Sequence, residues 1–268
     1  MDVNISFADG GIDAAVTDNR IGRLTINRPD KRNALTDAMW RAVPDAIDWL
    51  VSKQHVRVII LSGAGGRDFS AGADIGEFAT LRKDATTARA YEAGNSAAFA
   101  AVRNCPVPVV AAVRGICFGG GFGLAAAADI RLADATARFA IPAARLGLAY
   151  PLDAVQDLVR ALGDQQARHA LFSTRELSAE QALACGCLMA LCGPGELDTE
   201  ALALAASIAA AAPLSVRASK AAISAVQSGS REDHDQAAAL AASTFDSTDY
   251  AEGRRAFMEK RKPAFKGV

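Results

Sequence analysis

The segment from residue 106 to residue 134, PVPVVAAVRGICFGGGFGLAAAADIRLAD, constrains the fold of this chain most. Its β-branched apolar run from Val107 to Val113 is typical of a buried strand. Three consecutive glycines follow at positions 119–121, then an alanine-rich run from Leu124 to Ala128 with strong helix propensity, then a second apolar run from Ile130 to Ala133. The segment therefore predicts a β-α-β unit whose helix begins at glycines.

A helix that begins at glycines offers a distinctive chemical environment. Its first backbone N–H groups have no intrahelical acceptor, they carry a partial positive charge, and no side chains cover them. Such a place stabilises negative charge, either on a bound phosphate or on an oxyanion that forms during a reaction. A tight structural turn is the alternative interpretation, because glycine is common in turns of every kind.

Composition narrows the class of protein. The 268 residues suffice for one domain, or for one domain with a small appendage. The chain is 51% hydrophobic with a net charge of −1 and no long run of like charges, which disfavours nucleic acid or a membrane surface as a partner. Neither a membrane-spanning segment nor an N-terminal signal peptide is evident. Five cysteines in apolar surroundings are expected to be reduced, so we expect a cytoplasmic enzyme.

Strands and helices alternate along the first part of the chain, and helices follow to its end. A hairpin is expected from residue 14 to residue 26, with its turn at residues 17–20 (TDNR), and a buried strand from Val56 to Leu61. This order predicts an α/β fold with a helical C-terminal region. We expect an α/β core with the functional site in residues 1–193 and a helical region in residues 194–268.

Two glycine-rich loops, FSAGAD (69–74) and FGGGFGL (118–124), each come after a buried strand. Two backbone N–H groups from two such loops can converge on one carbonyl oxygen and stabilise the negative charge that develops there. Small residues matter in these loops because the substrate must lie against bare backbone. The pair of loops therefore points to polarisation of a thioester or another carbonyl group.

These loops, together with NRPDKRNAL, VIILSG and AEGRRAFMEKRKPAF, resemble the enoyl-CoA hydratase/isomerase, or crotonase, family over nearly the whole chain. The resemblance implies a spiral of β-β-α turns with a helical C-terminal part that forms a trimer, often a dimer of trimers. It also implies an acyl-CoA thioester substrate held in a bent pose. Coenzyme A would then enter as part of the substrate, with no permanently bound cofactor.

The resemblance also assigns residues. By position, Ala71 and Gly120 match the residues whose N–H groups form the family's oxyanion hole. The residues that it places near coenzyme A are Lys31 and Arg32 at the phosphates, Ala71, Gly72, Ala73, Asp74 and Gly120 along the adenine, the pantetheine and the thioester, and Phe257 and Lys260 in the tail, often from a neighbouring subunit.

The chain departs from the family at two positions that matter for chemistry. Hydratases of this family carry two glutamates, but here the matching positions are Gly123 and, in FAIPA, Ala143. A positioned acid or base contributes about 10²–10⁴-fold to a rate, so we expect poor hydratase activity. An isomerase, a decarboxylase or a C–C bond lyase acting on a thioester is at least as compatible. A non-catalytic acyl-CoA-binding protein is the hypothesis from another class.

The stretch LGLAYPLDAV offers two replacements for the absent carboxylates. Tyr150 could donate a proton or a hydrogen bond to a developing enolate, because its ordinary pKa near 10 keeps it protonated. Asp153 could act as a base if the site removes water from it. The alternatives are that Tyr150 is a packed turn residue and that Asp153 caps the following helix.

Other chemistries find little support in the sequence. The three histidines, at positions 55, 169 and 234, have no zinc-binding spacing, and Cys185 and Cys187 lack a second pair of ligands, so no metal site is expected. No G-x-S-x-G surrounds a serine, which argues against a hydrolase nucleophile. No G-x-G-x-x-G or G-K-[ST] motif occurs, which argues against a nucleotide fold.

Overall fold

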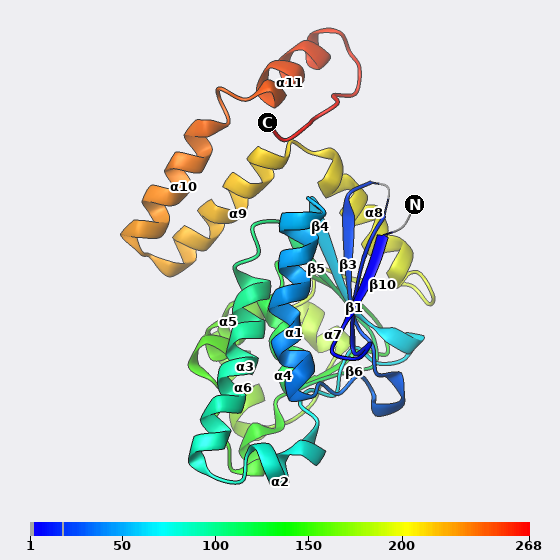
Figure 1. The fold of residues 1–268 in the computed structure, drawn as a ribbon, viewed down its shortest axis with the longest axis vertical. Helices are drawn as coiled ribbons and strands as arrows, with labels where there is room; N and C mark the ends of the chain where they lie inside the picture. Colours follow the sequence, from blue (N-terminus) through cyan, green and yellow to red (C-terminus); the bar gives the residue numbers. More distant parts are fainter. Residues whose placement is uncertain (1–2, 18) are drawn as a thin grey trace.

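A mostly parallel sheet forms the centre of the protein in a computed structural model that describes residues 3–17 and 19–268 (Figure 1). The first three strands are antiparallel and the rest, from β3 onward, are parallel. The strands in spatial order are β1 (Val3–Phe7), β2 (Ile12–Val16), β3 (Ile21–Ile26), β4 (Val58–Gly63), β5 (Val109–Val113), β7 (Ile130–Asp134) and β10 (Ala190–Cys192). The predicted turn at residues 17–20 includes residue 18, which lies outside the described residues.

A second, smaller sheet lies next to the glycine loops. It consists of β6 (Ile116–Phe118), β8 (Arg138–Ala140) and β9 (Leu177–Ser178). Strand β6 runs directly into the three glycines, and helix α4 begins at Gly120, earlier than the alanine run alone predicts.

Helices cover both faces of the main sheet because its parallel strands are apolar on both sides, as the fully buried strand β5 shows. One face carries the larger core, and α8 covers the other through Leu197, Ala201 and Ala205. The helices are α1 (Asp37–Asp48), α2 (Phe78–Leu81), α3 (Ala85–Arg103), α4 (Gly120–Ala127), α5 (Leu152–Leu162), α6 (Asp164–Ser173), α7 (Ala179–Ala184), α8 (Leu197–Ala210), α9 (Pro213–Ser228), α10 (Arg231–Ser243) and α11 (Thr248–Met258), with single turns η1 (Pro29–Lys31), η2 (Trp49–Lys53), η3 (Ala64–Gly66), η4 (Ile75–Glu77) and η5 (Pro142–Leu146).

The last three helices project away from the sheet (Figure 1). An ion pair of 2.7 Å between Lys220 Nζ of α9 and Asp129 Oδ2 ties them to the core. Arg57 adds a second tie, because it donates hydrogen bonds both to Ala209 O of α8 and to Phe265 O, which lies after α11. No single helix in the described part of the chain is long and apolar enough to cross a membrane; α8 and α9 reach that length and composition only as a pair bent by 107°.

Candidate functional site

A cavity of about 100 Å³ lies between the two glycine loops, helix α3 and the segment that precedes α5. Backbone atoms, apolar side chains and ionisable side chains all line this cavity. The residues that matter for its chemistry are Ala73, Glu92, Asn95, Gly120, Ala143 and Tyr150.

Ser70 fastens the first glycine loop to the strand that precedes the second. Its N–H donates to Ile116 O and its carbonyl accepts from Phe118 N–H, each at 2.9 Å. Its buried hydroxyl donates to Asn33 O at 2.7 Å, so the NRPDKRNAL segment is fixed to the same point. Three segments far apart in the sequence therefore meet at this serine.

Gly72 is where the two loops approach each other most closely. Its φ of +89° lies in the left-handed region. A Cβ atom at this position would lie 2.6 Å from Phe118 O and 3.0 Å from Gly120 N. Only glycine permits this conformation and this approach together.

Among the residues of the two glycine loops that line the cavity, two have backbone N–H groups with no acceptor in the described part of the chain. Gly120 is the first residue of α4, so its N–H has no intrahelical partner. Ala73 pairs with Leu35 as an isolated bridge in which Gly72 O and Asp74 N make the hydrogen bonds, each of 2.8 Å. The N–H of Ala73 therefore faces away from Leu35. Both residues line the cavity.

The prediction that Ala71 supplies one free N–H group is wrong for this structure. Ala71 lines the cavity, but its N–H donates to Arg32 O at 2.9 Å. In a regular strand, residues 71 and 73 would point their N–H groups to the same side. The left-handed conformation of Gly72 reverses the chain between them, so the free donor is Ala73.

Tyr150 lines the cavity, and its hydroxyl contacts the second loop. It donates to Gly119 O at 2.9 Å, and this oxygen also accepts from Gly123 N–H at 3.0 Å. Burial raises the pKa of Tyr150, so the hydroxyl stays protonated. Its single proton is directed at a carbonyl oxygen of the helix N-terminus, and its role as an acid stays a prediction.

The space that a glutamate at position 123 would need is already filled. A Cβ atom on Gly123 would lie 2.6 Å from the Tyr150 hydroxyl oxygen and 2.7 Å from the Phe99 ring. Ala143 lines the cavity with a methyl group only. The space beside Gly123 is thus taken by Tyr150 and Phe99, and position 143 presents no carboxylate to the cavity.

Asp153 does not line this cavity. It lies in the first turn of α5, where its carboxylate accepts from Ser96 Oγ at 3.3 Å and pairs with Arg103 at 3.6 Å. The structure therefore places it in an ion pair between α3 and α5, apart from the residues that surround the two N–H groups.

Asp74 is engaged within the first loop. It accepts from Arg28 Nη1 at 2.7 Å and caps the turn η4 by accepting from Gly76 N–H at 2.9 Å. The hydrogen bond from Arg28 holds the pKa of Asp74 below its usual range. Lys31 and Arg32 are exposed.

Phe257 and Lys260 are not brought to the cavity within one chain. Both are exposed at the end of α11, and Figure 1 shows α11 and α2 at opposite ends of the protein. Phe78 of α2 lines the cavity. A contribution from the tail of a neighbouring subunit stays a prediction.

The sequence analysis missed the polar side chains that α3 and the residues before it place in the cavity. Arg82 Nη2 pairs with Glu92 Oε1 at 2.6 Å. Asn95 is only 6% exposed, and its Oδ1 has no partner in the described part of the chain. The available signal was spacing, because positions 92, 95 and 99 recur on one face of a helix.

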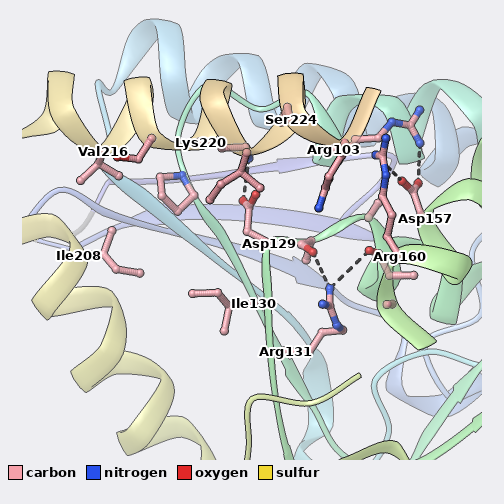
Figure 2. A pocket seen from close by; sticks show the side chains of 18 of the residues that line it. Arg103, Asp129, Ile130, Arg131, Asp157, Arg160, Ile208, Val216, Lys220 and Ser224 are labelled. Carbon is pink, nitrogen blue, oxygen red and sulfur yellow. Dashed lines mark hydrogen bonds and ion pairs between the residues drawn. The ribbon is translucent and has the colours of Figure 1, made fainter. Parts of the chain in front are cut away.

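A second cavity, of about 630 Å³, lies at the other end of α4, between α9 and the core (Figure 2). Apolar side chains such as Ile208 and Val216 line it, and Lys220 and Asp129 meet across it. It contains neither glycine loop. Across residues 3–17 and 19–268, no group of three His, Cys, Asp or Glu side chains is arranged to hold a metal ion.

The protein therefore has an α/β fold with a pocket in which two glycine loops present free backbone N–H groups. The family model for enoyl-CoA hydratase/isomerase matches residues 17–268, and the chain belongs to this family. It is 33% identical over 252 residues to a crotonyl-CoA hydratase of Syntrophomonas wolfei, covering 92% of this chain and 95% of the relative. It is 32% identical over 249 residues to a short-chain-enoyl-CoA hydratase of Clostridium acetobutylicum, covering 91% and 94%.

Solved structures agree with the sequence comparison. The crystal structure of an enoyl-CoA hydratase/carnithine racemase from Magnetospirillum magneticum superposes with a TM-score of 0.90 at 36% identity, covering 96% of each chain. These findings confirm the predicted family, the α/β crotonase-type fold and an enzyme of this family, which acts on CoA thioesters.

Proposed function

We propose that this protein stabilises the enolate oxygen of an acyl-CoA thioester with the N–H groups of Ala73 and Gly120. The observation that carries the proposal is that two unpaired backbone donors, from two loops in direct backbone contact, line one cavity. Donors that are fixed before the reaction need no reorganisation when charge develops. Loss of one such donor costs about 3 kcal/mol of barrier.

The rest of the thioester would follow the first loop. The carbonyl oxygen of Arg32 accepts a hydrogen bond from the Ala71 N–H. The exposed side chains of Arg32 and Lys31 therefore extend from backbone that lies next to the first glycine loop. Two cations suit the phosphates of coenzyme A. Phe257 and Lys260 of a neighbouring subunit would complete the coenzyme A site.

We propose proton transfer at the α-carbon in preference to hydration. The contacts of Gly123 and Ala143 support this choice, because no carboxylate at either position can hold and activate water. Isomerisation, decarboxylation and C–C cleavage all pass through the same thioester enolate. The two relatives named as hydratases are 33% and 32% identical to this chain.

We also propose that the chain forms a homo-oligomer, a trimer or a dimer of trimers. Support comes from large apolar side chains that one chain leaves exposed on α9 and at the C-terminal helices, and from the groove beside α9 in Figure 2. These side chains are Ile223 and Val226 of α9 and Phe245, Tyr250, Phe257 and Met258 further along. The division between residues 193 and 194 stays a prediction.

A pair of variants at Gly120 tests the donor directly. Proline is tolerated at the first position of a helix but has no N–H, so Gly120→Pro removes the donor. Gly120→Ala is the matched control, because it adds the same Cβ beside the Trp40 ring, at 2.7 Å, but keeps the N–H. We expect exchange of the butyryl-CoA α-proton with deuterated water to fall about 10²–10³-fold further in Gly120→Pro than in Gly120→Ala. Equal rates in the two variants would refute the role of this N–H.

Measurements on the wild-type protein distinguish an acyl-CoA enzyme from a non-catalytic acyl-CoA-binding protein. Calorimetry should show micromolar binding of acetoacetyl-CoA, and crotonyl-CoA hydration should be slow. Binding without α-proton exchange for any thioester tried would favour a non-catalytic acyl-CoA-binding protein. Absence of binding at saturating ligand would exclude both hypotheses.

A further inference from the structure

We propose that Glu92 is the group that removes and returns the proton at the thioester α-carbon, in place of the two absent carboxylates. The inference rests on the proposed enolate chemistry and names the proton-transfer residue that this chemistry needs. It is carried by where α3 places its polar side chains.

Helix α3 turns one face toward the cavity. Glu92, Asn95 and Phe99, at positions i, i+3 and i+7, all line it. Glu92 is the one acidic side chain among the described residues that do so. A carboxylate on the rigid wall of the pocket that holds both N–H donors satisfies the first requirement for a general base, which is access to the substrate.

Arg82 holds the Glu92 carboxylate in place. Its guanidinium lies between the rings of Phe78 and Tyr91, 4.3 Å and 4.5 Å from their centres. Its side chain is 9% exposed, and it contacts Glu92 Oε1 at 2.6 Å. This ion pair anchors one carboxylate oxygen of Glu92 at the wall of the cavity.

Asn95 gives independent evidence that this face meets a polar ligand. Its side chain is almost fully buried, and its Oδ1 accepts no hydrogen bond in the described part of the chain. A buried acceptor without a partner costs about 1–3 kcal/mol. A ligand that donates an N–H or O–H group beside Glu92 would remove this cost.

The surroundings of Glu92 favour a base that is stronger than an exposed glutamate. Burial raises the pKa of Glu92, the positive charge of Arg82 opposes this rise, and Asp153 of α5 adds to it. Tyr150, from the segment before α5, faces the same cavity as a neutral phenol. A carboxyl group with a raised pKa transfers protons more efficiently near neutral pH in both directions.

The proposed step needs no additional reactant. The Glu92 carboxylate takes the α-proton. The electron pair of the broken C–H bond forms a C=C bond to the carbonyl carbon, and the C=O π pair moves onto the thioester oxygen beside Ala73 and Gly120. The resulting carboxylic acid then returns a proton to the α-carbon. In a β,γ-unsaturated acyl group it can return the proton to the γ-carbon, which moves the double bond into conjugation.

The test compares four variants in the exchange of the butyryl-CoA α-proton with deuterated water. Glu92→Gln keeps a hydrogen-bond acceptor for Arg82 but cannot take a proton, and we expect its exchange to fall by about 10²–10⁴-fold. Glu92→Asp keeps the acid on a shorter side chain and should retain more exchange than Glu92→Gln. Asp153→Asn removes the carboxylate that does not line the cavity, and Glu232→Gln changes an exposed residue of α10. Glu232→Gln should exchange like the wild type, and Asp153→Asn, which removes a charge that raises the pKa of Glu92, should lose far less exchange than Glu92→Gln.

Acetoacetyl-CoA affinity and thermal unfolding are measured on every variant. Loss of exchange in Glu92→Gln with affinity and unfolding temperature preserved supports the assignment. Exchange in Glu92→Gln within about threefold of the wild type, or a similar loss in Asp153→Asn, overturns it and leaves the proposed function intact. Absence of exchange in the wild-type protein overturns both. If Glu92→Gln unfolds, Glu92→Ala takes its place, and a folded Glu92→Ala that exchanges like the wild type overturns the assignment.

Discussion

Replacement of Gly72 by alanine should damage stability and chemistry together, because this residue holds the two glycine loops against each other. Its φ of +89° costs an L-residue about 1–2 kcal/mol. The new Cβ would also meet Phe118 O at 2.6 Å and Gly120 N at 3.0 Å, both of which are backbone atoms. Overpacking of this kind costs about 1–3 kcal/mol. We therefore expect Gly72→Ala to lower the free energy of unfolding by about 2–5 kcal/mol.

Gly186→Ala separates the two contributions. Gly186 has a similar φ of +81°, but a Cβ there would have nothing within 4 Å. This control should lose only the conformational part, about 1–2 kcal/mol. Urea unfolding of the wild type and both variants measures the difference, which is the contact between the loops.

The same contact sets the spacing of the Ala73 and Gly120 N–H groups. A shift of either loop moves one donor away from the thioester oxygen, so α-proton exchange should fall by about 10²-fold or more in Gly72→Ala. Gly186→Ala should exchange normally. If Gly72→Ala were as stable as Gly186→Ala and exchanged at the wild-type rate, the reasoning on loop contact would be refuted.

Three further outcomes are expected. Tyr150→Phe removes the hydrogen bond from the phenol to Gly119 O, which still accepts from the Gly123 N–H. The free energy of unfolding should therefore fall by about 0.5–1.5 kcal/mol. A loss of exchange of about 10²-fold in this variant would instead identify the phenol as the acid. Gly123→Glu should fail to create crotonyl-CoA hydration, because the Tyr150 hydroxyl occupies its space, and rapid hydration would contradict this packing argument. Arg28 lowers the pKa of Asp74, so the ionised carboxylate stabilises the folded state. This stabilisation is present above the unfolded pKa of about 3.9 and is lost as pH falls through the lower folded pKa. Between pH 7 and pH 3, the free energy of unfolding measured in urea should therefore fall less in Asp74→Asn than in the wild type.

The elements with strong local patterns were predictable from the sequence. The buried parallel strands are apolar runs, and the unit around positions 119–121 forms a strand, a glycine turn and a helix as expected. Strand β1 was missed because Val3–Phe7 is exposed and lacks an apolar run. A strand of this kind is defined by its partner β2 more than by its own residues.

The site was predictable only where one residue type decides the geometry. Gly72 and Gly120 follow from the need for bare backbone, and both lie where the loops meet. The choice between Ala71 and Ala73 depends on the sign of one φ angle, which no composition reveals. Glu92 belongs to a helix 18 residues after Asp74 and reaches the cavity only through tertiary packing.

The crowding around Gly123 makes positions 123 and 150 a single choice for this backbone. A phenol at one and a carboxylate at the other would claim the same volume, so each excludes its alternative. The phenol at position 150 therefore leaves no room for a carboxylate at position 123 of this chain. A glutamate at position 123 of this backbone would require a smaller side chain at position 150 and a displaced Phe99 ring.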